Sequence, residues 1–160
     1  MDANYKIEGK GGMDSTKGFE VNTVRDALAL LSVLCYKRFG ADALPLIGEV
    51  CHKLGRSIGN QMRTNLDSFD LKSVGNAFLE GARRRKSPVT LLELTEKRIR
   101  VRSERCGLGL AGAGRPICEA MMNMDIGIFE AATGEEIDLS ILKTVAAGDE
   151  CCDVIFTSKG

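Results

Sequence analysis

The chain has 160 residues, enough for one ordinary domain, and 44% of them are hydrophobic, so it can bury a core. Its 22 basic and 22 acidic residues cancel to a net charge of zero, which removes any global attraction to nucleic acid or to an anionic membrane. No apolar stretch approaches the length of about 18 residues that a membrane-spanning helix needs.

The N-terminal segment is polar and rich in glycine, without the apolar region of a signal peptide. We therefore expect a flexible leader over residues 1–20 and a single domain over residues 21–158. Six cysteines are present, and a chain without an export signal is expected to keep them reduced in the cytoplasm.

Apolar residues at helical spacing predict three helices in residues 22–86. The first covers residues 22–39 and ends at Gly40, a residue suited to the position after a helix. The second begins near Asp42 as N-cap, with Pro45 in its first turn. The third is expected over residues 70–85, with the basic run after Ala82 as a solvated helix end.

A stripe of small residues runs along the second predicted helix beside its apolar face: Gly48, His52, Gly55 and Gly59. Glycine costs about 1 kcal/mol relative to alanine within a helix, so the stripe indicates close approach by another group. A second helix backbone is the favoured partner, from the same chain or from a second subunit, which predicts a homodimer. A bound ligand, contacted by His52, is the alternative.

After residue 88 the apolar period changes from 3.6 to 2, which predicts strands over residues 89–94 and 98–103 joined as a hairpin. On the second strand Ile99 and Val101 face one way. Three arginines face the other way, toward water or toward an anion: Arg98, Arg100 and Arg102.

A helix is predicted from Pro116 to Thr133, and a second hairpin from residues 137–146 and 151–156. Residues 89–157 are therefore β-β-α-β-β, a four-stranded antiparallel sheet with a helix across one face. The fold class is α+β, with the N-terminal helices packed against this unit.

The segment Gly107 to Gly112 matches the pattern G-x-G-x-x-G of dinucleotide-binding proteins. The strand before it alternates polar and apolar residues, unlike a buried parallel strand, and too little chain follows to complete such a sheet. We interpret the glycines as a loop over a pocket.

Three cysteines of the second half converge in this topology. Cys106 ends a strand, Cys118 lies in the first turn of a helix, and Cys152 shares a strand face with Val154 and Phe156. A helix N-terminus lowers the pKa of a thiol, so Cys118 is expected to be reactive. Met122 and Asp125 follow Cys118 on the same helical stripe. A nucleophilic cysteine, a soft-metal site and buried thiols all remain open.

Several short motifs resemble the aminothiazoline-carboxylate hydrolase family and the related 4-vinyl-reductase-type domains, which bind small hydrophobic molecules. They are Arg105-Cys106, Arg115-Pro116-Ile117-Cys118-Glu119, Lys143-Thr144 and Gly148-Asp149-x-x-Cys152-x-x-x-Phe156, with Arg38 to Ala43 earlier in the chain. The first family implies hydrolytic opening of a cyclic amidine-like ring. The second implies a sensor or carrier, and its sensor members hold zinc with cysteines and a glutamate. Cys118 and Cys152 match two of those ligands, but Ile141 and Thr144 stand where the other two would fall, which argues against zinc.

Two functions follow as hypotheses. One is hydrolysis of a non-peptide C–N bond, without a cofactor, with Cys118, Glu119, Asp149 and Cys152 as catalytic residues. The other is non-catalytic binding of a small apolar molecule by a sensor, which would need a separate effector partner. In both, the ligand contacts Cys106, Met122, Asp125 and His52.

Overall fold

The structure is a computed structural model, and it describes residues 17–87 and 89–160. The predicted leader therefore lies almost entirely outside the described residues. Within these residues, five α-helices and two short 3-10 helices accompany one sheet. The order is α1 (Val24–Phe39), η1 (Gly40–Ala43), α2 (Leu44–Arg63), α3 (Leu71–Arg84), β1 (Thr90–Leu94), β2 (Arg98–Ser103), α4 (Arg115–Met121), α5 (Asn123–Thr133), β3 (Ile137–Lys143), η2 (Val145–Ala147) and β4 (Cys152–Ser158). The predicted α+β class is confirmed.

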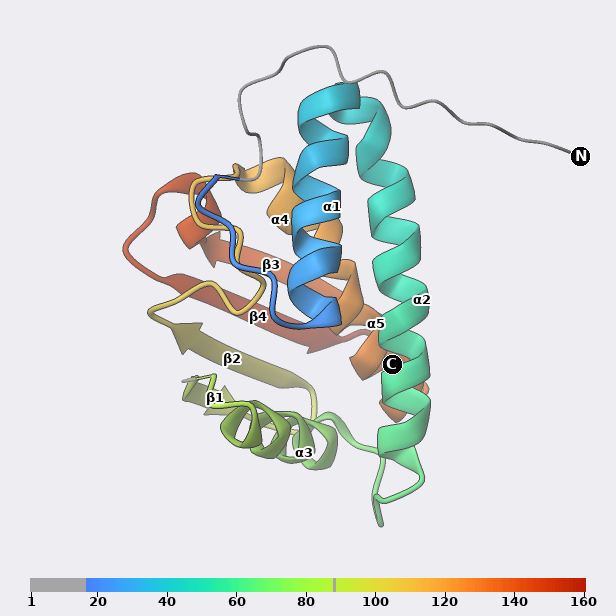
Figure 1. Cartoon of the computed structure of the whole chain (residues 1–160). Helices are drawn as coiled ribbons and strands as arrows, with labels where there is room; N and C mark the ends of the chain where they lie inside the picture. The colour runs from blue at the N-terminus through green and yellow to red at the C-terminus, as the bar shows by residue number, and fades with distance from the viewer. Residues whose placement is uncertain (1–16, 88) are drawn as a thin grey trace, which may run out of the picture.

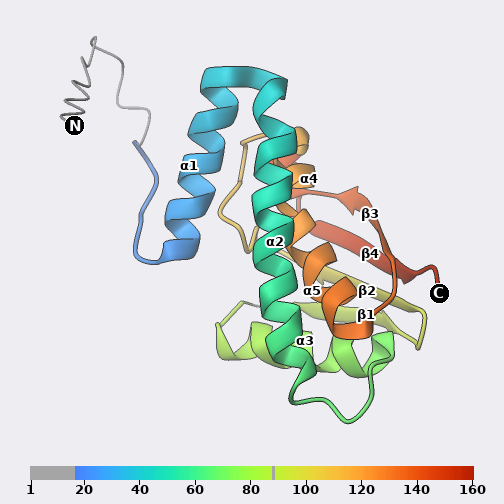
Figure 2. The same ribbon diagram turned by 90° about the vertical axis from the view of Figure 1, so that its right-hand side faces the viewer.

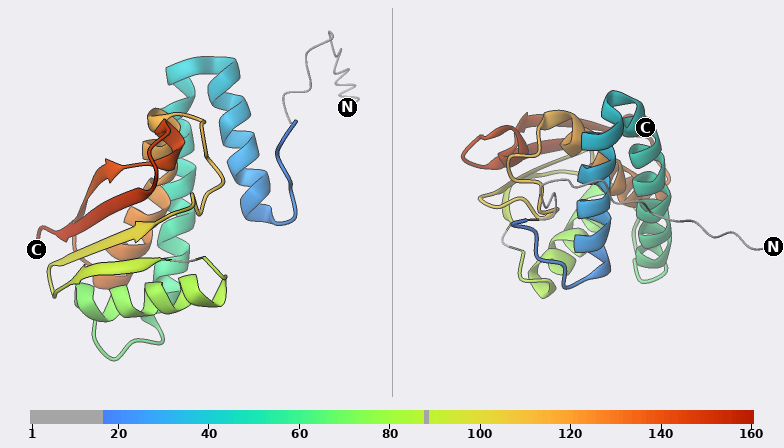
Figure 3. Two further views of the ribbon diagram at one scale, coloured as in Figure 1. Left: turned by 90° about the vertical axis from the view of Figure 1, so that its left-hand side faces the viewer. Right: turned by 45° about the horizontal axis from the view of Figure 1, so that its top comes forward.

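The sheet has the strand order β1-β2-β4-β3, and every neighbouring pair is antiparallel. Figure 3 shows the four strands side by side, with α5 and then α2 behind them. Helix α5 therefore lies between the sheet and the α1–α2 hairpin, as Figure 1 also shows, while α3 packs on the β1–β2 part of the same face. The predicted sheet with a helix across one face is confirmed.

Three aromatic rings join the layers of the core. The ring of Phe129 on α5 lies 5.0 Å from that of Phe78 on α3 and 4.6 Å from that of Phe156 on β4. Ile99, completely buried, lies opposite Phe156 on the neighbouring strand, so its predicted inward orientation is correct. This packing holds α3, α5 and the sheet in fixed positions around the cavity described below.

Two of the three arginines on β2 pair with a carboxylate of the same chain. Nε and Nη2 of Arg100 donate to the two carboxylate oxygens of Asp153 on β4 at 2.9 Å, and Arg102 donates to the same group at 2.9 Å. Asp153 is 2% exposed, and these hydrogen bonds hold its pKa at about 2. The pairing satisfies a buried carboxylate on the face of the sheet opposite Phe156.

The glycine stripe of α2 packs against α5 of the same chain, which Figure 2 shows running alongside it. The interpretation of the stripe as a subunit contact is therefore wrong. A methyl group at Gly127 of α5 would lie 2.5 Å from the carbonyl oxygen of His52, and similar overlaps occur at Gly55 and Gly59. Glycine on both helices lets the two backbones touch.

Two predicted helix boundaries need correction. Residues 116–133 form two helices, because the backbone departs from the helix at Met122. The side-chain amide of Asn123 donates to the carbonyl oxygens of Glu119 and Ala120, at 3.1 and 3.0 Å, and so adds hydrogen bonds at the end of α4. Asp42 is not an N-cap, since it lies within η1 and α2 starts at Leu44.

The last hairpin is shorter than predicted at its first strand. Strand β3 ends at Lys143, because Thr144 turns the chain into η2: its hydroxyl accepts the backbone N–H of Ala146 at 3.2 Å. The glycine-rich loop is fastened to this turn, with the N–H of Gly114 donating to the carbonyl oxygen of Ala146 at 2.8 Å. The turn and the loop together close one end of the sheet.

In the described part of the chain, no helix combines the length and the apolar character needed to cross a membrane.

Candidate functional site

A cavity of about 120 Å³ lies between the inner face of the sheet and helices α3, α4 and α5. We call it the sheet cavity. Its apolar wall comes from all these elements and includes Phe78, Val101, Leu108, Met122, Val154 and Phe156. Apolar walls with a few polar groups at fixed places are typical of small-molecule sites.

Three thiols meet at one end of the sheet cavity: Cys106, Cys118 and Cys152. The sequence thus predicts correctly that these segments converge. Each thiol accepts a hydrogen bond. The hydroxyl of Thr144 donates to Sγ of Cys118 at 3.2 Å, and the N–H of Leu110 donates to Sγ of Cys106 at 3.3 Å. The N–H of Val145 donates to Sγ of Cys152 at a longer distance of 3.5 Å. All six cysteines of the chain are free thiols in the structure.

The thiolate of this group belongs to Cys106. Its pKa falls to about 6, mainly because the thiol of Cys152 donates a hydrogen bond to it. Burial acts to raise this pKa, and the N–H groups of Leu110 and Leu108 act to lower it further. The same hydrogen bond raises the pKa of Cys152, which keeps its proton. Near neutral pH the pair is therefore one thiolate and one thiol.

Cys118 behaves differently from the sequence-based expectation. Burial raises the pKa of its thiol, and the hydrogen bond from Thr144 offsets only part of that rise. The side chain is 5% exposed. The expectation of a low pKa at this helix start is wrong, because removal from water outweighs the field of a helix of only seven residues.

Asp125 supplies the carboxyl group of the sheet cavity. It lies in the first turn of α5, and its accessible surface faces the cavity. Burial raises its pKa to about 6, although Arg25 and Arg85 favour the charged form. Met122, at the break between α4 and α5, lines the same cavity. The carboxyl group therefore changes protonation state close to physiological pH.

Three of the predicted site residues lie away from the sheet cavity. Glu119 is exposed and pairs with Arg115 at 2.8 Å. Asp149 accepts the backbone N–H of Thr144 at 2.8 Å and so holds the turn after β3. His52 pairs with Glu130 of α5 at 2.7 Å across the α2–α5 contact. Their roles in catalysis or ligand binding remain predictions.

Zinc does not fit the sheet cavity. In the residues that the structure describes, no group of three or more histidine, cysteine or acidic side chains is placed to hold a metal ion, the three cavity thiols included. Thr144, at one of the positions where the resemblance would require a ligand, instead donates a hydrogen bond from its hydroxyl to Sγ of Cys118.

Sequence reasoning missed two arginines of the site. Arg25 stands at the start of α1, and Arg85 belongs to the basic run interpreted as a solvated helix end. Arg83 fits that interpretation, since it is exposed and pairs with Glu80 at 3.5 Å. Arg85 instead lines the sheet cavity. No local pattern separates the two, because both are arginines of one basic run at the end of α3: Arg83 lies in its last turn and Arg85 is its C-cap.

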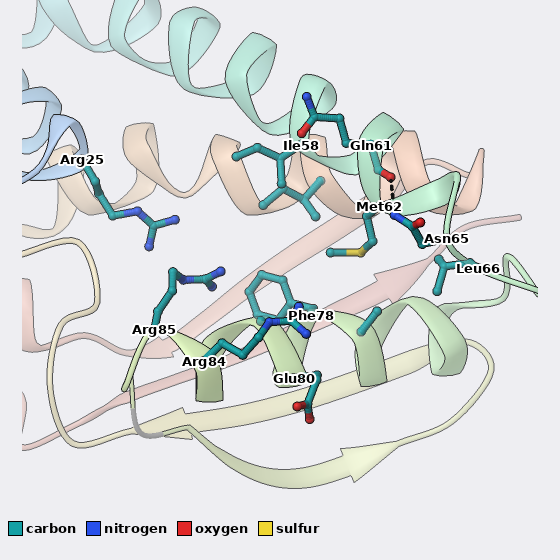
Figure 4. A pocket seen from close by; sticks show the side chains of 13 residues that line it. Arg25, Ile58, Gln61, Met62, Asn65, Leu66, Phe78, Glu80, Arg84 and Arg85 are labelled. Carbon is teal, nitrogen blue, oxygen red and sulfur yellow. Dashed lines mark hydrogen bonds between the residues drawn. The ribbon is translucent and has the colours of Figure 1, made fainter.

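A second cavity, of about 460 Å³, opens between α2 and α3; we call it the helix cavity. Figure 4 shows its apolar side chains, Ile58, Met62, Leu66 and Phe78, together with the arginines at one end. It adjoins the sheet cavity, because Arg25, Phe78 and Arg85 line both.

Comparison with known proteins relates the chain to others by fold alone. No protein-family model and no curated protein matches it. Among solved structures it is similar to the phenol-responsive sensory domain of the transcription activator PoxR bound to phenol, at 16% identity and a TM-score of 0.63 over 87% of this chain and 76% of that one. It is also similar to a trafficking protein particle complex subunit 3 from Naegleria fowleri covalently bound to palmitic acid, at 10% identity and a TM-score of 0.65 over 85% and 93% of the two chains. These comparisons do not support the resemblance to aminothiazoline-carboxylate hydrolases.

Proposed function

We propose that this protein is a binding domain for a small, largely apolar molecule, of the kind that serves a sensor, and that the ligand occupies the sheet cavity. The observation that carries the proposal is the cavity itself. Its volume of about 120 Å³ is close to that of an engineered apolar protein cavity of about 150 Å³ that binds benzene. A molecule with a single ring therefore matches the available space.

The two similar structures support a binding role. One is a sensory domain bound to phenol, and the other carries a palmitic acid. Both share the fold of this chain and hold an apolar molecule, so the fold is compatible with such a site. Binding also agrees with the lining, in which apolar side chains surround a few polar groups that can orient a ligand.

Hydrolysis has less support than binding. Glu119 and Asp149, two of the three residues expected to carry a proton, do not line the sheet cavity, whereas the third, Asp125, does. The thiolate is that of Cys106 rather than Cys118. General acid–base catalysis requires the carrier within hydrogen-bond reach of the reacting group. The hydrolase therefore remains a prediction that turnover of a cyclic amidine by the purified protein would establish.

A phenol titration with a cavity-filling variant tests the binding proposal. Val154→Phe places a ring inside the sheet cavity, whereas Leu142→Phe adds the same ring at an exposed position of β3. Phenol should raise the melting temperature of the wild type saturably, since a ligand that binds only the folded state stabilises it. The effect should persist in Leu142→Phe and vanish in Val154→Phe. Absence of saturable binding by phenol, benzamide and benzoate alike would overturn the proposal.

We also propose that two copies of the chain associate, through a surface different from the glycine stripe. Leu46, Val50 and Leu54 follow one another at a spacing of four residues on α2, and they are 66%, 55% and 41% exposed. An apolar stripe of this kind on a helix is buried when a second helix covers it. The free thiols are consistent with a cytoplasmic location, which we keep as part of the proposal.

A further inference from the structure

The boundary between the two cavities is made by two arginines and an aromatic ring. Arg25, Phe78 and Arg85 line both the sheet cavity and the helix cavity. Arg25 extends from the first turn of α1, and Arg85 follows the end of α3. In Figure 4 their guanidinium groups point toward one another across the end of the helix cavity.

Neither guanidinium has an acidic partner in the described residues. Arginines elsewhere on the molecule do: Arg83 pairs with Glu80, Arg98 with Glu93, and Arg100 with Asp153. No carboxylate of residues 17–87 or 89–160 lies within 4.0 Å of Arg25 or Arg85, and neither donates a side-chain hydrogen bond there. Donors of both guanidinium groups are thus available at the boundary to an acceptor that is not part of the described chain.

The charges around this boundary are unbalanced. Asp125 is the acidic residue of the sheet-cavity lining, and it faces Arg25 and Arg85. Three further cations belong to the lining: Arg102 pairs with Asp153 and Lys143 with Glu150, whereas Arg105 is exposed to solvent. The guanidinium groups of Arg25, Arg85 and Arg105 therefore stand against the carboxyl group of Asp125 and the thiolate of Cys106, and a positive charge remains beside an apolar cavity.

Partial burial adds a cost to this excess charge, although Arg85 keeps contact with solvent. Burial, and then the neighbouring charge of Arg25, lower the pKa of Arg85. Two like charges held near each other and partly removed from water repel, and an anion between them would relieve that repulsion. The ligand-free protein thus holds an arrangement that a bound anion would stabilise.

We propose that Arg25 and Arg85 bind the carboxylate of a small organic acid whose apolar part occupies the sheet cavity. The inference rests on the proposed binding function and narrows its ligand to an acid. A guanidinium group matches a carboxylate geometrically, because two parallel N–H donors reach the two oxygens. The cavity of about 120 Å³ limits the apolar part to about one ring, and Phe78 lies where that ring would join the carboxylate.

Benzoate and benzamide are the probes that test this inference. They have nearly the same shape, but only benzoate is charged. Isothermal titration should show that wild-type protein binds benzoate at least about tenfold more tightly than benzamide, as charge-assisted hydrogen bonds predict. The preference should decrease as salt is added, because the groups are partly exposed.

Substitutions of the two arginines test whether they cause the preference for benzoate. The double variant Arg25→Gln, Arg85→Gln should lose most of the affinity for benzoate and keep that for benzamide, whereas Arg83→Gln, outside both cavities, should change neither. Arg85→Lys retains the charge but not the paired donors, so its affinity for benzoate should be intermediate. Circular dichroism and benzamide binding verify that each variant is folded.

The outcomes separate this inference from the proposed function. Equal, salt-independent binding of benzoate and benzamide by the wild type would overturn the inference and leave the binding function standing. An unchanged preference for benzoate in the double variant would also overturn it. Failure of benzoate, benzamide and phenol to bind would overturn the proposed function itself.

Discussion

Gly55 and Met124 lie against each other where α2 and α5 come closest: the backbone carbonyl oxygen of Met124 fills the space in which a side chain at Gly55 would begin. A backbone oxygen cannot move aside as the end of a side chain can. This contact fixes the distance between the helices and therefore the position of Asp125, the next residue, in the sheet cavity.

Gly55→Ala should therefore destabilise the protein by about 3 kcal/mol, the upper end of the cost of overpacking, or prevent folding. Gly48→Ala is the matched control on the same stripe, because the added methyl would meet the side-chain amide of Asn123 at 3.2 Å, which can shift. Its free energy of unfolding in urea should change by less than about 1 kcal/mol. Equal effects of the two substitutions would contradict the assigned contact.

Limited alkylation should label Cys106 before the other cavity thiols. With a pKa of about 6, its labelling rate should reach half its maximum near pH 6, compared with about 8.5 for a free thiol. Cys152→Ala removes the donor that stabilises the thiolate and should move the midpoint upward. Peptide mass spectrometry identifies the labelled residue. Label found first on Cys118 would contradict the assignment, since burial raises the pKa of that thiol.

Asp125→Asn should stabilise the ligand-free protein at pH 7. The pKa of Asp125 rises from 3.8 in the unfolded chain to about 6 in the fold, so its ionised form is disfavoured there, and stability is lost as pH rises from about 4 through about 6. Arg25 and Arg85 oppose this effect, and the thiol of Cys51 on α2 also faces the carboxyl group.

The gain at pH 7 should be about 2 kcal/mol, and it should nearly vanish at about pH 3, where the carboxyl group is mostly protonated in both states of the wild type. Urea unfolding at the two pH values measures it. A gain of the same size at both pH values would show that the substitution acts through packing rather than through charge.

Light scattering coupled to size exclusion should give a mass twice that of one chain. Val50→Asp should shift the protein to the monomer, because a charge in the middle of a buried apolar stripe is costly. Leu142→Asp, at an exposed position of the sheet, is the control and should leave the mass unchanged. A monomeric wild type would remove the proposed association.

Local sequence patterns were sufficient to predict most elements of the fold. The change of apolar period near residue 88 separates helices from strands, and the alternation along β2 correctly orients Ile99 and Val101 inward. The stripe containing Gly55 correctly indicates a close approach. Such features depend on residues within a few positions of one another, so they can be read from the chain directly.

Only the tertiary structure decided which residues act together. Three relationships each join segments at least 46 positions apart in the chain: the contact of Gly55 with α5, the hydrogen bond from Cys152 to Cys106, and the approach of Arg25 to Arg85. Asp125 owes its raised pKa to burial. The two thiols owe the opposite shifts of their pKa values first to the hydrogen bond between them, and N–H groups near Cys106 in the sequence add to the shift of that thiol. Desolvation and long-range hydrogen bonding arise only once the layers have packed, and for this reason the chemistry of the site could not be predicted from its residues alone.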